Sequence, residues 1–118
     1  MVEFSLTTRQ GPVGPVIEVA GDLDMASAPQ LRDRLLEVVE AGAGAVVVDL
    51  TQVGFVDSSG LGALVLAYKS LREREGWMGL AGVRQPVRKV FSITSVDRVI
   101  PLFETVREAE EASPAAVR

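Results

Sequence analysis

The fold of this chain is decided by residues 45–62, with the sequence AVVVDLTQVGFVDSSGLG. The apolar run Ala45–Leu50 is broken only by Asp49 and predicts a strand buried on both faces. After Phe55 and Val56 come one acid, two hydroxyls and a glycine, and a helical pattern then runs from about Gly60 to Glu75. A buried strand that leads through a short polar turn into a helix is typical of an α/β fold.

The flanking sequence repeats this alternation. Short β-branched runs before and after the Gly/Pro-rich segment 11–15 predict an N-terminal hairpin, and Ser27, with Gln30 three residues later, predicts a capping box at the start of a helix. Strands are expected at Val2–Thr8, Val16–Ala20, Trp77–Ala81 and Val99–Phe103. One short helix is expected to begin at Pro86, and a last helix to span Thr105–Ala112. We therefore expect a single α/β domain over residues 1–112, followed by a frayed tail at residues 113–118. Its mostly parallel mixed sheet has about five strands, an antiparallel hairpin edge and about four helices.

In such sheets the functional surface lies where the carboxyl ends of the strands lead into helix N-termini. Two polar loops occupy these places, Gly21–Asp24 after the second strand and Gly54–Ser59 after the third. If the two strands are neighbours, Asp22, Asp24, Asp57 and Ser58 share one face of the molecule.

Composition excludes several classes of protein. The 118 residues contain no cysteine and no histidine, which removes disulfides, thiol catalysis, the commonest general base and the commonest zinc ligands. The net charge of −4 disfavours a nucleic-acid or anionic-membrane partner. The N-terminus has no signal-peptide pattern, and no apolar run approaches the ~20 residues of a membrane span, so we expect a cytoplasmic protein without membrane insertion.

Ser58 and Ser59 stand at the predicted start of a helix, where backbone N–H groups lack partners and negative charge is favoured. A serine in this position is either an N-terminal cap or a site that gains and loses a phosphate. Position alone does not separate the two interpretations.

Several motifs together resemble those of the STAS-domain anti-sigma factor antagonists. The resemblance is carried by Asp57-Ser58-Ser59-Gly60-Leu61-Gly62, preceded by Val47–Leu50 and Phe55-Val56, by the loop Gly21-Asp22-Leu23-Asp24, and by the helical segment Pro86–Phe91. It extends from about Val16 to Glu110.

The resemblance implies a partner switch rather than an enzyme. The unphosphorylated antagonist binds an anti-sigma factor that is also a serine kinase, and this releases a sigma factor. Phosphorylation of the serine directly after the motif's aspartate, here Ser58, ends binding, and a phosphoserine phosphatase restores it. The resemblance thus implies partner contacts by Asp22, Asp24, Asp57, Ser58, Ser59, Gly60 and Gly62, and no cofactor. With this motif, Ser59 is left as the cap, and the two glycines would let the kinase approach closely.

Other interpretations stay open at this point. The protein could be a STAS subunit of a transport, lipid-trafficking or stress-signalling assembly, with Ser58 only a cap, or a small nucleotide-binding protein. Asp22 and Asp24 could charge a turn, and with Asp57 they could hold a metal ion, although no spacing specifies one. Arg84, Arg88 and Lys89 fit a solvated helix face better than a phosphate site. No heptad repeat indicates an oligomer, so we expect a monomer when the protein is free.

Overall fold

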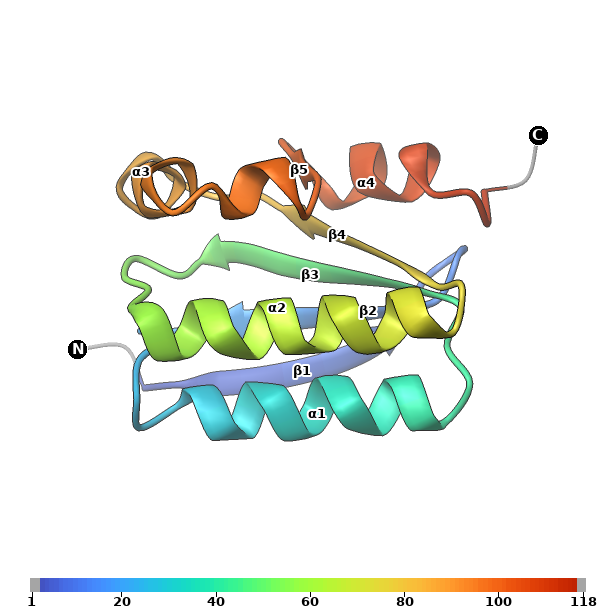
Figure 1. Cartoon of the computed structure of the whole chain (residues 1–118), viewed down its shortest axis with the longest axis horizontal. Coiled ribbons are helices and arrows are strands. Elements are labelled where there is room, and N and C mark those ends of the chain that lie inside the picture. Colours follow the sequence, from blue (N-terminus) through green and yellow to red (C-terminus); the bar gives the residue numbers. More distant parts are fainter. Residues whose placement is uncertain (1–2, 117–118) are drawn as a thin grey trace.

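The computed structural model describes residues 3–116 and consists of a five-stranded sheet with helices on both faces (Figure 1). The elements in chain order are β1 (Ser5–Gln10), β2 (Pro15–Ala20), α1 (Ala28–Glu40), β3 (Ala45–Gln52), α2 (Ser58–Glu73), β4 (Trp77–Ala81), α3 (Gln85–Ile93), the 3₁₀ helix η1 (Val96–Arg98), β5 (Leu102–Phe103) and α4 (Val106–Ala112). The expected α/β class, the hairpin and the four helices are confirmed.

The strands follow one another across the sheet in the order β1-β2-β3-β4-β5. β1 pairs with β2 in antiparallel fashion, with Leu6 opposite Val19, and all other pairs are parallel. β2 and β3 are therefore parallel neighbours, with Ile17 opposite Val48. Because neighbouring parallel strands end at the same edge, this pairing brings the two polar loops of the sequence analysis together.

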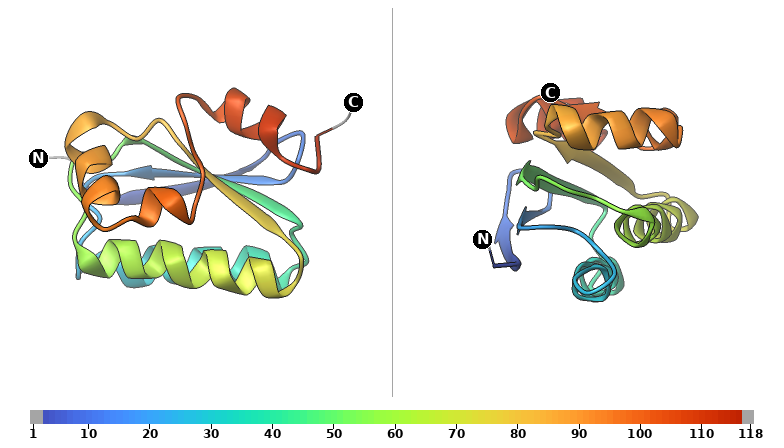
Figure 2. Two further views of the ribbon diagram at one scale, coloured as in Figure 1. Left: turned by 45° about the horizontal axis from the view of Figure 1, so that its top comes forward. Right: turned by 90° about the vertical axis from the view of Figure 1, so that its left-hand side faces the viewer.

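One face of the sheet forms the main core with α1 and α2, which lie side by side in both figures (Figures 1 and 2). Alternate strand residues point to this face because successive side chains of a strand alternate between faces. They meet the helical stripes, and the fully buried members include Ile17, Leu31, Leu35, Val46, Val48, Leu64, Leu71 and Leu80. Phe91 of α3 belongs to the same cluster, whereas Trp77 and Phe103 are half-buried and pack against each other with ring centroids 6.0 Å apart.

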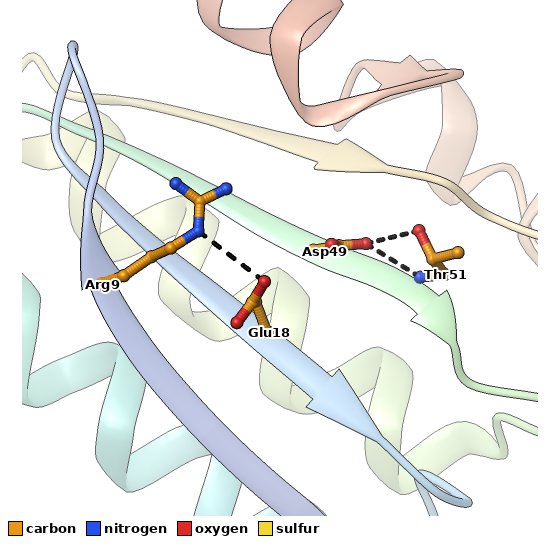
Figure 3. Close-up of polar contacts among 4 residues, drawn as sticks. All are labelled: Arg9, Glu18, Asp49 and Thr51. Carbon is orange, nitrogen blue, oxygen red and sulfur yellow. Dashed lines mark hydrogen bonds and ion pairs between the residues drawn. The ribbon is translucent and has the colours of Figure 1, made fainter.

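The other face of the sheet is covered only in part. α4 packs on β3 and β4, where Val16, Val47, Ala81 and Ala109 form a small second core. Beyond α4 this face is polar: Arg9 forms an ion pair with Glu18 (Nε to Oε2, 3.7 Å), and Asp49 accepts hydrogen bonds from Thr51 (Figure 3). The expectation that all of Ala45–Leu50 is buried on both faces is wrong at Asp49, which is half-buried and lies outside the small core under α4.

The C-terminal boundaries differ from expectation. Residues 99–101 are not part of a strand: Val96–Arg98 form η1, and β5 contains only Leu102 and Phe103. Ser113, expected to be the start of the frayed tail, is buried, and its N–H donates to the carbonyls of Ala109 and Glu110. Among residues 3–116 no helix is long and apolar enough to cross a membrane.

Candidate functional site

The loops after β2 and β3 are joined to each other by backbone hydrogen bonds. Leu23 and Val56 form an isolated parallel bridge, in which the Leu23 N–H donates to the Phe55 carbonyl (2.9 Å) and the Asp57 N–H donates to the Leu23 carbonyl (3.1 Å). Leu23 and Val56 are both buried, so the bridge is shielded from water. The expected juxtaposition of the two polar loops is therefore confirmed, and they form one rigid unit at the carboxyl end of the sheet.

Asp57, not Ser59, caps α2. Its extended backbone precedes the helix, and its Oδ1 accepts hydrogen bonds from the N–H groups of Ser59 (2.8 Å) and Gly60 (3.2 Å). The prediction that Ser59 is the cap is wrong, because the helix begins two residues earlier than expected and Asp is as good an N-cap as Ser. The preference of Asp for this position was the signal in the sequence that could have identified the cap.

Ser58 is the first residue of α2 and is exposed to solvent. Within residues 3–116 its hydroxyl forms no hydrogen bond, so it has no structural task in the free protein. The hydroxyl is thus available to a reagent from outside, at a helix end that favours negative charge. Ser59, by contrast, is half-buried beside it.

The two glycines of the motif have different surroundings. A Cβ on Gly60 would lie 2.7 Å from Cγ and 2.8 Å from the carbonyl oxygen of Leu23, so only glycine lets the β2–α1 loop approach the helix. Gly60 is buried, so the structure gives it a role in the packing of the fold, and its contact with a partner stays a prediction. Gly62 is exposed, and a Cβ there would meet no atom within 4 Å. The fold does not require glycine at position 62.

The acidic loop before α1 is held by Ser27. The Ser27 hydroxyl donates to the Asp22 carbonyl (2.7 Å) and accepts from the Asp24 N–H (3.0 Å), and Asp24 Oδ1 accepts from the N–H groups of Ala26 and Ser27. The predicted capping box is wrong, since Ser27 forms no side-chain cap on α1. The carboxylate of Asp24 is thus engaged within its loop, whereas Asp22 is exposed beside the Leu23 bridge.

Three exposed apolar side chains near the N-terminal half of α2 were not predicted from the sequence. Met25 is 76% exposed, Phe55 51% and Leu66 43%. Met25 and Leu66 border a shallow groove of about 340 Å³ between the N-terminal halves of α1 and α2, whose lining includes Ser59 and Gly62. A sequence pattern could not identify these residues, because exposure of single apolar residues depends on how the two helices pack.

The described residues offer little to a metal ion or cofactor. Within residues 3–116 no group of three or more potential metal ligands comes together. Arg88 forms an ion pair with Glu104 (3.4 Å), and Lys89 is exposed on α3. The chemistry present is that of a recognition surface: a free hydroxyl, carboxylates and apolar side chains.

Comparison with known proteins agrees with this geometry. Residues 4–109 match the STAS domain family. The chain belongs to this family. It is 39% identical over 87 residues to the anti-sigma-B factor antagonist of Listeria monocytogenes, a match covering 73% of this chain and 75% of that protein. This STAS domain therefore belongs with the anti-sigma factor antagonists.

Two solved structures extend the comparison. An anti-sigma factor antagonist from Mycobacterium paratuberculosis superimposes with a TM-score of 0.86 at 30% identity, and the match covers 94% of each chain. The Bacillus cell fate determinant SpoIIAA in its phosphorylated form gives a TM-score of 0.69 at 25% identity, covering 91% of this chain and 96% of that one.

Proposed function

We propose that this STAS protein, when unphosphorylated, binds an anti-sigma factor that is also a serine kinase, and that this frees a sigma factor. Phosphorylation of Ser58 ends the binding, and a phosphoserine phosphatase reverses the modification. The protein acts as a regulator rather than an enzyme and needs no cofactor of its own, because the kinase supplies ATP. The observation that carries the proposal is the Ser58 hydroxyl, exposed and without a hydrogen bond at the start of α2.

The electrostatics of the helix end support a modification that spares the fold. A phosphoserine carries about −1.5 to −2 charges at pH 7, and the helix N-terminus stabilises such a charge by roughly 0.3–1 kcal/mol. Repulsion from the Asp57 carboxylate opposes this with about 3 kcal/mol per unit charge at ~5 Å and an effective dielectric constant of ~20. Because Ser58 is exposed, water screens much of this repulsion. The two effects partly cancel in the free protein.

The same charge has a larger effect inside a complex. When a partner covers Ser58, an added phosphate loses its water and must find a hydrogen-bonding partner or remain buried and unpaired. A thousandfold loss of affinity corresponds to about 4 kcal/mol, which is within the cost of an unpaired buried charge. Phe55, three residues before Ser58, and Met25 and Leu66, which border the groove lined by the adjacent Ser59, supply exposed apolar surface that such a partner would cover.

Incubation with the cognate anti-sigma kinase and ATP, followed by intact-mass analysis, tests the proposal. We expect the mass of one phosphate group to be added to the wild type and to Ser59→Ala, and none to Ser58→Ala. In the same experiment Ser58→Asp is expected to retain the wild-type urea midpoint but to bind the kinase about a thousandfold more weakly. Phosphorylation of Ser58→Ala, or undiminished binding by Ser58→Asp, would contradict the proposal.

A further inference from the structure

A second exposed surface lies on α3 and η1, away from the groove beside Ser58. It consists of Lys89, Ile93, Arg98 and Val99, which we call the α3–η1 surface. Ile93 is 73% exposed and Val99 50%, and both basic residues are exposed as well. Lys89 and Ile93 are four residues apart on one helix, so they share a face. α3 and η1 are in contact, so the two pairs lie on adjoining segments of the chain.

This surface is not needed for the core of the protein. α3 already packs into the main core through Val87 and Phe91, which are buried. Ile93 and Val99 lie outside that contact, and neither Lys89 nor Arg98 takes part in an ion pair within residues 3–116. Exposed apolar side chains that share a helix face with free charges, as Ile93 does with Lys89, are typical of interaction sites.

The charge of this surface is opposite to that of the rest of the chain. Residues 84–98 carry four basic side chains and one carboxylate, whereas the whole chain has a net charge of −4. The two polar loops contribute the carboxylates of Asp22, Asp24 and Asp57, and residues 21–24 and 54–62 contain no basic side chain. Arg32 of α1 lines the groove beside them, but it is paired with Asp33 (3.4 Å). One end of the molecule thus presents an acidic loop cluster and a basic helix, since α3 lies at the same end of the sheet as the β3–α2 loop (Figures 1 and 2).

We propose that the α3–η1 surface is a second contact for the anti-sigma partner, where it receives an acidic patch of that protein. This inference rests on the proposed function and adds a partner contact that is separate from Ser58. A standard interface involves about 20–30 residues on each side, which is more than the two polar loops provide. A partner seated on Phe55 and Ser58 therefore extends over neighbouring surface, and α3 lies at that end of the molecule.

The two patches of opposite charge determine one orientation of the partner. Acidic groups of the partner face Lys89 and Arg98, while its basic groups face Asp22, and the reversed arrangement places like charges together. Complementary charges of this kind act mainly on the association rate and on the choice of partner. The contact at α3 is therefore expected to be sensitive to salt and independent of the phosphorylation state of Ser58.

The test measures association and dissociation rates with the purified cognate anti-sigma factor at low and high salt. The variant Lys89→Glu/Arg98→Glu reverses two charges on the α3–η1 surface. A control, Lys69→Glu/Arg107→Glu, reverses two exposed charges elsewhere: Lys69 is on α2, away from its N-terminus, and Arg107 on α4 has an 87% exposed side chain. We expect the association rate to fall about tenfold in the first variant at low salt and less than twofold in the control, with the difference vanishing at high salt. Ile93→Ser is expected to accelerate dissociation several-fold without changing the urea midpoint.

The outcomes separate this inference from the proposed function. Binding that Ser58→Asp abolishes, but that both charge-reversal pairs change equally, would overturn only the contact at α3. Salt-dependent dimerisation of the free chain that Lys89→Glu/Arg98→Glu removes would assign the surface to a second copy and overturn the inference. Sedimentation with phosphatidylglycerol vesicles that this variant loses would assign it to a lipid surface with the same consequence. A wild-type chain that does not bind the anti-sigma factor overturns both proposals.

Discussion

The β3–α2 junction has a buried inner layer and an exposed outer layer, and the two differ in whether they have room for a larger side chain. In the inner layer, Leu23, Val56 and Gly60 are buried, and a single added methyl group at Gly60 would collide with Leu23. In the outer layer, Ser58 and Gly62 are exposed, and a methyl group on Gly62 would meet nothing. Residues of the two layers alternate within one short motif. The residues of this motif therefore have two roles: some hold the two loops tightly together, and others form an exposed surface above them.

Gly60→Ala breaks the inner layer and has the largest expected effect on stability. The new Cβ lies too close to Cγ and the carbonyl oxygen of Leu23. Overpacking costs about 1–3 kcal/mol, and here the upper end applies because the clashing oxygen belongs to a backbone that the bridge to Val56 holds in place. The gain of about 1 kcal/mol in helix propensity offsets only part of this cost. We expect the free energy of unfolding, measured by urea denaturation, to fall. An unchanged or higher midpoint would contradict the role given to Gly60.

Asp57→Ala has the next largest expected effect on stability, because it removes the N-cap of α2, which lies between the two layers. Loss of an N-cap typically costs about 1 kcal/mol, and here two N–H groups lose their acceptor. Asp57→Asn should restore most of the stability, since Asn caps equally well, and Ser59→Ala should change the free energy of unfolding by less than ~0.5 kcal/mol. A larger loss of unfolding free energy in Ser59→Ala than in Asp57→Ala would mean that Ser59, and not Asp57, caps α2.

The two layers also differ in how far the sequence predicts them. The strand and helix patterns predicted a mostly parallel sheet with two polar loops at the carboxyl ends of its strands, because apolar periodicity reports directly which residues are buried. That β2 and β3 are neighbours was only a condition of the prediction, and the structure supplies it. The choice of cap was wrong because Asp57, Ser58 and Ser59 are all good capping residues, so a shift of the helix start by two residues changes the assignment. The bridge between Leu23 and Val56 depends on a contact across 33 positions of the chain, which no local pattern encodes.

Other differences between the sequence-based predictions and the structure also arise from tertiary contacts. The place where α4 packs on the sheet leaves Asp49 outside its contact, and the packing of α1 on α2 makes Met25 and Leu66 border a groove. At the C-terminal side, the short apolar run at Val99–Phe103 suited a strand, but a 3₁₀ turn and a two-residue strand form instead. Short apolar runs do not distinguish such alternatives, since tertiary contacts decide between them.

Gly62→Ala tests the outer layer and has the smallest expected effect on the fold. Because the added methyl group meets no atom, the helix should gain up to about 1 kcal/mol from the better propensity of alanine. The expected change in the free energy of unfolding is opposite in sign to that expected for Gly60→Ala two residues earlier. The two variants therefore form a matched pair of controls in one helix. Urea denaturation of both variants measures the difference.

The same variant also tests whether position 62 contacts a partner or merely accepts a larger side chain. Gly62 lines the groove beside Ser58, so its new methyl group occupies space that a partner could use. We expect Gly62→Ala to be more stable than the wild type and yet to bind the anti-sigma factor more weakly, by about 5- to 30-fold, as for a substitution that costs about 1–2 kcal/mol at an interface. A gain in stability with unchanged affinity would place the partner away from the groove. It would leave Ser58 and Phe55, rather than the groove between α1 and α2, as the centre of the contact.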